Sequence, residues 1–159
     1  MKKLISILIV LFTSTLVFAQ SADAISEILK SEQATIGQVS YLCAVQQLKI
    51  LESDDYEKAV EAMISEGYLP ENVSSSDLVT LSQAAFLFSK NWDINGGLMY
   101  MITKGSRRYV FKQFVADGVI SVYADPSSKL SGSELLALYS SALGRYGDFN
   151  MKSVSMEAE

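Results

Sequence analysis

Apolar residues recur at helical spacing through most of the chain after its first twenty residues. Val60, Met63 and Ile64, for example, are separated by three residues and then one, which places them on one face of an α-helix. The polar residues Glu57, Lys58 and Glu61 would form the opposite face. This pattern predicts an all-α fold, with helices over residues 22–30, 35–51, 53–67, 80–88, 107–117 and 131–143.

Local signals mark where several of these helices begin and end. A capping box is a hydroxyl residue followed three positions later by Glu or Gln, and it satisfies backbone groups of the first helical turn. Ser53 and Asp54 are expected caps for the helix that follows them, and Gly67 and Gly118 are expected helix stops. The three capping boxes are Thr35 with Gln38, Thr80 with Gln83, and Ser131 with Glu134.

The order of helix, stop glycine, loop and capping box occurs twice with a constant offset. Residues with matching roles lie 51 positions apart: Val60 and Phe111, Met63 and Phe114, Gly67 and Gly118, Leu69 and Ile120, Thr80 and Ser131, Gln83 and Glu134, Leu87 and Leu138. Chance agreement is the alternative, because few of the paired residues are identical. We expect a tandem repeat of two full helix-loop-helix copies plus a shortened N-terminal one, packed as one small helical domain.

The segments that open the second helix of each unit resemble the S-layer homology repeat, whose corresponding motif has the form Ile-Thr-Arg-Ala-Glu. They are residues 34–38, 79–83 and 130–134. The resemblance implies an all-helical arrangement and attachment of exported proteins to cell-wall polysaccharide. Ile36, Leu81 and Gly132 stand where that family has its glycan-binding Arg, so the family's ligand is not implied. Residues 96–100 followed by Arg107-Arg108-Tyr109 also resemble small exported proteins of spirochaete-type bacteria.

The N-terminus is typical of a secretory signal peptide. Lys2 and Lys3 precede a short apolar run, and Val17 and Ala19 suit a cleavage site after residue 19. An uncleaved membrane span is disfavoured because the run is shorter than the roughly 20 residues needed to cross a bilayer. We expect a signal peptide over residues 1–19, a helical domain over 20–146, a flexible tail over 147–159, and no membrane span after cleavage.

Charge and cysteine content exclude several classes. After removal of residues 1–19 the chain has 11 basic and 18 acidic residues, a net charge of −7, which argues against nucleic acid and anionic membrane surfaces as default partners. The single cysteine, Cys43, cannot close an intramolecular disulfide. Its apolar neighbours predict a buried side chain.

The usual catalytic residues are scarce. The sequence has no His, so catalytic triads, Cys-His nucleophiles and the usual zinc sites lack a member or a ligand. The Asn95-Gly96-Gly97 stretch lacks the spacing and the Lys of a phosphate-binding loop. We expect no enzyme activity, no cofactor and no metal.

The stretch from Trp92 to Tyr109 joins the two full units and holds the candidate ligand- or partner-binding residues, Trp92, Tyr100, Arg107, Arg108 and Tyr109. Aromatic faces beside Arg side chains are suited to an acidic sugar or a partner's carboxylates. The competing interpretation is that the aromatic residues pack between repeats, that the glycines form a tight turn, and that the arginines begin a solvated helix.

These features favour an exported, periplasmic or extracellular, non-catalytic binding or adaptor module of the bacterial cell envelope. Its expected partner is an envelope protein or a cell-wall polysaccharide. The alternative is a structural subunit that forms a homo-oligomer through its apolar and aromatic surface.

Overall fold

The computed structural model describes residues 23–92, 94 and 96–156, so the expected signal peptide and residues 157–159 lie outside the described residues. As predicted, the described chain is all-helical, and no strand is present in it. Residues 23–30 form the first helix. The others are α2 (Ile36–Gln46), α3 (Tyr56–Ser65), α4 (Leu81–Phe88), α5 (Leu98–Ile102), α6 (Arg107–Ala116) and α7 (Gly132–Met156).

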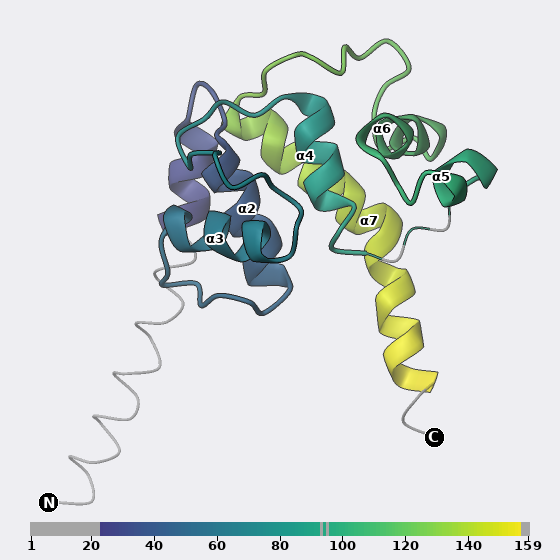
Figure 1. Ribbon diagram of the computed structural model, residues 1–159, viewed down its shortest axis with the longest axis horizontal. Helices are drawn as coiled ribbons and strands as arrows, with labels where there is room; N and C mark the ends of the chain where they lie inside the picture. The colour runs from purple at the N-terminus through teal and green to yellow at the C-terminus, as the bar shows by residue number, and fades with distance from the viewer. Residues whose placement is uncertain (1–22, 93, 95, 157–159) are drawn as a thin grey trace, which may run out of the picture.

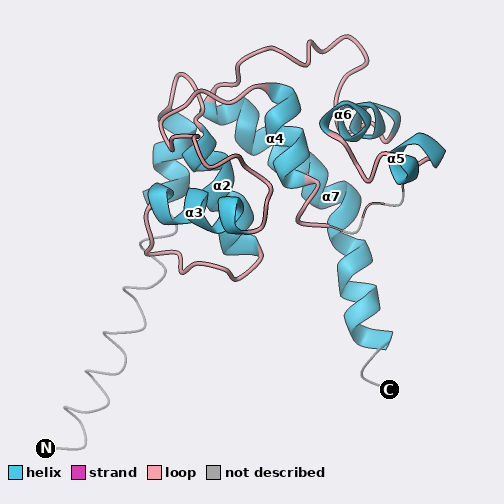
Figure 2. Cartoon of the chain, in the orientation of Figure 1, coloured by secondary structure: helices cyan, strands magenta, loops and turns pink. Residues whose placement is uncertain are grey.

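The helices pack as neighbouring pairs rather than as a parallel bundle. Helix α2 packs on α3 at one side of the molecule, and α4 packs on α6 toward the other (Figure 1). The long α7 crosses behind α4 in this view, and α5 lies at the outer edge beside α6. Loops connect all of these elements (Figure 2). Among the described residues, no helix has the length and apolar character needed to cross a membrane.

Backbone hydrogen bonds tie three helix starts to segments distant in sequence. The N–H of Ile36 donates to the carbonyl of Asp77 at 2.7 Å, and the N–H of Leu81 donates to the carbonyl of Ser128 at 2.9 Å. The third bond links the start of α7 to the end of the first helix, since the N–H of Gly132 donates to Ser31 at 2.9 Å. The last of these bonds joins the two ends of the folded domain.

An aromatic cluster fills the core between α4, α6 and α7. Trp92 lies between Tyr139 and Tyr146, with ring centroids 6.1 Å from each. Phe88 packs on Tyr139 at 5.2 Å and Phe114 on Tyr146 at 5.4 Å. Such tilted pairs add to the large apolar area that aromatic rings bury. The cluster therefore holds together segments that lie far apart in the sequence.

The three predicted capping boxes form. Thr35 accepts a hydrogen bond from the N–H of Gln38, and Thr80 accepts one from the N–H of Gln83; in both pairs the glutamine side chain also bonds the cap's backbone. The third box, Ser131 with Glu134, has the same two bonds. The predicted glycine stops are confirmed as well, because Gly67 and Gly118 have φ of +73° and +76°.

The cap of α3 and the end of α2 differ from expectation. Asp55, rather than Ser53 or Asp54, caps α3 by accepting from the N–H of Lys58 at 2.9 Å. Helix α2 ends at residue 46 instead of 51. Leu48 has φ +56°, and this left-handed residue turns the chain out of the helix in the position that glycine usually occupies.

The predicted helix end at Gly144 and Gly147 is wrong, since α7 continues through both glycines to Met156. The predicted tail boundary at residue 147 therefore falls inside α7. Glycine in a helix interior costs about 1 kcal/mol relative to Ala. Tyr146 offsets this cost, because its ring is buried and its hydroxyl donates to Oδ2 of Asp117 at 2.7 Å. Burial and that bond raise the pKa of Tyr146.

Cys43 is fully buried on α2, as predicted. Burial raises the pKa of its thiol well above the usual range, so the thiolate needed for nucleophilic chemistry is disfavoured.

Candidate functional site

The main candidate site is a surface groove of about 520 Å³ at the start of α6, which we call the cationic groove. Its lining combines the first turns of α6 with one residue of α4 and one residue of the loop before α7. The lining residues are Ser82, Arg107, Arg108, Phe111, Lys112 and Pro126. The N–H of Ser82 donates to the carbonyl of Pro126 at 3.0 Å, and this bond fixes the loop beside α4.

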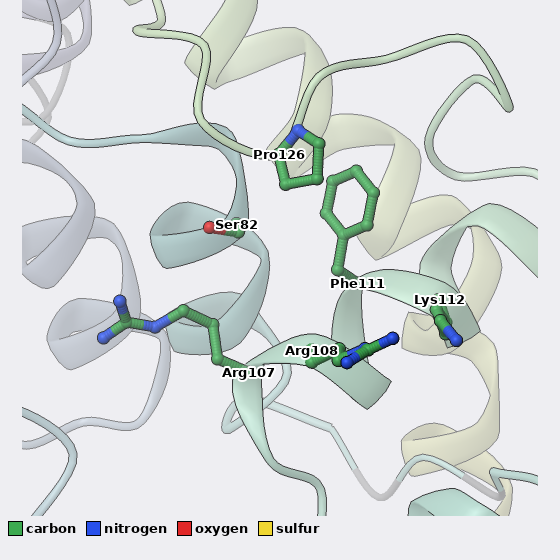
Figure 3. A pocket seen from close by; sticks show the side chains of 6 residues that line it. All are labelled: Ser82, Arg107, Arg108, Phe111, Lys112 and Pro126. Atoms are coloured by element: carbon green, nitrogen blue, oxygen red, sulfur yellow. The ribbon is translucent and has the colours of Figure 1, made fainter.

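The groove has an apolar part between charged walls. The rings of Phe111 and Pro126 lie next to each other in Figure 3, and Phe111 is buried. The Arg107 side chain extends to one side of the α6 start, whereas Arg108 and Lys112 extend to the other side. A ligand with an apolar body and separated acidic groups would match this arrangement better than a compact anion would.

The cations of the groove are exposed and are not neutralised by neighbours. Arg107, Arg108 and Lys112 form no ion pair with a carboxylate in the part of the chain that the structure describes. Arg107 and Arg108 also stand in the first turn of α6, where the helix dipole disfavours positive charge. Ser106 caps this helix by position only, since its side chain makes no capping hydrogen bond. Folding thus leaves this positive charge available to a partner.

Trp92 does not belong to the surface of this site. Its side chain is buried in the aromatic core cluster, which agrees with the packing interpretation of this residue. Sequence proximity to Arg107 therefore does not translate into a shared binding surface.

Tyr100 and Tyr109 line a second, neighbouring hollow of about 360 Å³. Lys112 lines both hollows, and its Nζ lies 5.5 Å from the centroid of the Tyr109 ring, within the range of a cation–π contact. The structure thus brings four of the five candidate residues to the α5–α6 region and divides them between two adjacent hollows. The full lining of the second hollow is Gly97, Leu98, Met99, Tyr100, Tyr109, Lys112 and Gln113.

Four residues of the cationic groove were missed by sequence reasoning. Lys112 could have been found, because it lies four residues after Arg108 and hence on the same helical face. For Phe111, the sequence pattern indicated a core residue on the apolar face of its helix and gave no indication of a binding site. Ser82 and Pro126 carried no signal, since each reaches the groove through the backbone contact between α4 and a loop more than 40 residues later.

An acidic hollow of about 280 Å³ lies beside the start of α3. Burial, followed by the charge of Glu27, raises the pKa of Tyr56 in this hollow to about 12. Asp54 is half-buried, and its pKa is lowered by hydrogen bonds that its carboxylate accepts from Lys58 and from the N–H of Leu51. The residues that line this acidic hollow are Asp23, Ala24, Glu27, Tyr41, Glu52, Asp54, Asp55, Tyr56 and Glu57. Despite these carboxylates, no group of three or more potential metal ligands is arranged to hold an ion within the described residues.

Comparison of the chain with protein-family models, with curated proteins and with solved structures gives no match. The functional argument therefore rests on the site itself.

Proposed function

We propose that this chain is an exported, non-catalytic binding or adaptor module of the cell envelope, which contacts acidic groups of an envelope protein or a cell-wall glycan through the cationic groove. The observation that carries the proposal is the cluster of three unneutralised cations around an apolar floor, in a chain whose formal net charge is −5. Charge of that kind favours association with carboxylates.

We further propose that the domain consists of tandem helix-loop-helix units in an arrangement similar to S-layer homology repeats. Matched backbone bonds support the repeat. Ile36 bonds Asp77 as Leu81 bonds Ser128, and Gly37 bonds Ser75 as Ser82 bonds Pro126. In both pairs the acceptors are 51 residues apart and the donors 45. The packing of α2 on α3 likewise corresponds to that of α4 on α6.

The repeat makes the charge of the groove informative. With the 51-residue offset, Arg108 and Lys112 correspond to Glu57 and Glu61 on α3. At the first of these positions, in the opening turn of the helix, an acidic residue such as Glu57 is favourable and a basic one such as Arg108 is not. The fold therefore does not need positive charge here, and a local rule broken without structural compensation favours a functional role.

Retention on envelope material tests the groove. Envelope material is extracted with detergent to remove lipid, so that only protein and glycan remain. We expect the double variant Arg107→Ala, Arg108→Ala to bind at least about tenfold more weakly, which corresponds to about 1.4 kcal/mol, with unchanged helical circular dichroism.

The matched control is Glu57→Gln with Glu61→Gln, at the corresponding positions on α3. This control should be retained as well as the parent. Equal retention of the arginine variant and the parent would remove the groove from the proposed function.

A structural or assembly subunit is the second candidate, favoured by one observation. The acidic hollow and the cationic groove lie at corresponding ends of α3 and α6, so one copy carries surfaces of opposite sign that could meet head to tail in successive copies. Sedimentation at several concentrations tests this candidate. Self-association should weaken at high salt, because screening reduces exposed charge–charge attraction. A monomer at every concentration and at low salt would rule the candidate out.

A further inference from the structure

Helix α5 is held in place by one aromatic residue on its inner side. A Cβ added to Gly96 would lie 2.2 Å from Cγ of Tyr100, and one added to Gly105 would lie 3.1 Å from its hydroxyl. The ring therefore lies against the backbone of two glycines. The N–H of Gly105 also donates to the carbonyl of Tyr100 at 2.9 Å, and the N–H of Gly97 donates to Oε1 of Gln113 at 3.1 Å. These contacts fix the orientation of α5 on α6.

The opposite side of α5 presents large apolar side chains to solvent. Leu98, Met101 and Ile102 are 71%, 69% and 65% exposed, and their spacing places them on one helical face. Met99 is exposed beside them. Single exposed apolar residues are ordinary, but a contiguous group on an anchored element marks an interaction surface. Figure 1 shows α5 at the outer edge of the molecule, away from α2 and α3.

The segment that carries this apolar face is rich in positive charge. Between Gly96 and Ala116 the chain has four basic residues, Lys104, Arg107, Arg108 and Lys112, and no acidic one. All four basic side chains are exposed. Lys112 lines the same hollow as Leu98 and Met99, which places a cation directly beside the apolar residues. Residues 96–116 therefore have a positive net charge, although the net charge of the whole chain is negative.

From this combination we infer that α5 and the start of α6 form a peripheral docking site for an anionic phospholipid surface. The aliphatic and thioether side chains enter the boundary between headgroups and acyl chains, while the neighbouring cations contact lipid phosphates. The inference goes beyond the proposed function, since its apolar residues line no part of the cationic groove. It runs counter to the expectation, drawn from net charge alone, that anionic membranes are disfavoured partners.

Shape and composition favour a bilayer over a protein partner. The apolar face is carried by a five-residue helix, whereas a specific protein interface buries about 800 Å² on each partner and needs a complementary pocket. A lipid surface accepts protruding side chains of any shape. Acidic residues elsewhere in the chain then limit how deeply the domain approaches, because the anionic lipid headgroups repel them.

Vesicle sedimentation tests this inference with the exported chain, lacking residues 1–19. The vesicles contain phosphatidylcholine alone or with phosphatidylglycerol. We expect binding to the anionic vesicles that weakens with salt, and at least about tenfold weaker binding to phosphatidylcholine. The triple variant Leu98→Ser, Met101→Ser, Ile102→Ser should lose at least about tenfold of the anionic-vesicle binding.

The matched control is Val122→Ser with Tyr123→Ser, which removes two side chains that are 71% and 95% exposed in the loop after α6. This control should bind like the parent. Failure of the parent to bind anionic vesicles, or equal binding by the triple variant, would overturn the inference. A parent that forms dimers without vesicles, together with a monomeric triple variant, would also overturn it and assign α5 to a second copy of the chain. Retention on lipid-free envelope material is unaffected by these outcomes, so the groove is tested separately.

Discussion

At the scale of single residues, backbone conformation decides which positions tolerate change. Gly118 ends α6 in the left-handed region, and nothing lies within 4 Å of a Cβ built there. The N–H of Val119 donates back to Phe114 at 2.9 Å across this turn. Glycine is therefore needed at position 118 because of the positive φ, and a side chain there would meet no steric clash with neighbouring residues.

Gly118→Val should lower the free energy of unfolding by about 1–3 kcal/mol, because a β-branched residue is strained at positive φ. Urea unfolding measures this loss. Gly97→Ala is the control, since Gly97 also has open space around its Cβ position but has φ of −65°. The control should change stability by less than about 0.5 kcal/mol. A comparable loss in both variants would contradict the strain argument.

At the scale of elements, the cap of α7 makes part of the domain's stability depend on pH. The pKa of Glu134 is lowered by hydrogen bonds from the N–H and hydroxyl of Ser131. A lowered pKa in the folded state stabilises the fold above the unfolded pKa of about 4.3, and this contribution disappears as the pH falls. The glutamine caps of α2 and α4 make the same backbone bond without titrating.

Glu134→Gln should therefore keep the cap of α7 and remain within about 0.5 kcal/mol of the parent at neutral pH. Between about pH 6 and pH 3 the variant should lose less stability than the parent does. Urea unfolding at several pH values checks the difference. Gln83→Glu, the reverse change on α4, should increase the acid sensitivity. Parallel pH profiles for all three proteins would show that the caps do not contribute to it.

At the scale of the whole molecule, one contact joins the first helix to α7. A Cβ at Gly132 would lie 1.6 Å from the carbonyl oxygen of Ile28 and 2.5 Å from the hydroxyl of Ser31. The Ser31 carbonyl also accepts from Gly132. Because backbone atoms cannot move aside as a flexible side chain can, even one methyl group would separate these two elements.

Gly132→Ala should lower the free energy of unfolding by about 1–3 kcal/mol, the usual effect of overpacking. In this variant, residues 23–30 should lose hydrogen-exchange protection before the rest of the domain does. Gly144→Ala is the control on the same helix, where nothing lies within 4 Å of the added Cβ. It should stabilise the protein by about 0.5–1 kcal/mol. Unchanged protection of residues 23–30 in the Gly132 variant would show that this contact does not hold the first helix in place.

The sequence by itself determined the features that depend on neighbours a few residues away. The three capping boxes, the glycine stops and the period of the apolar residues arise from bonds or faces within one or two helical turns. These features sufficed to predict an all-α chain and most helix starts. They also identified Arg107 and Arg108 as exposed charge, which the structure places in one groove.

Tertiary packing alone decided the rest. Trp92 is core because α4, α6 and α7 enclose it, and α7 passes through Gly144 because burial of Tyr146 outweighs helix propensity. The groove acquires Ser82 and Pro126 from segments that meet only in the fold. Which residues are buried, and which line a common surface, depends on contacts between segments far apart in the sequence. Local residue patterns do not specify those contacts.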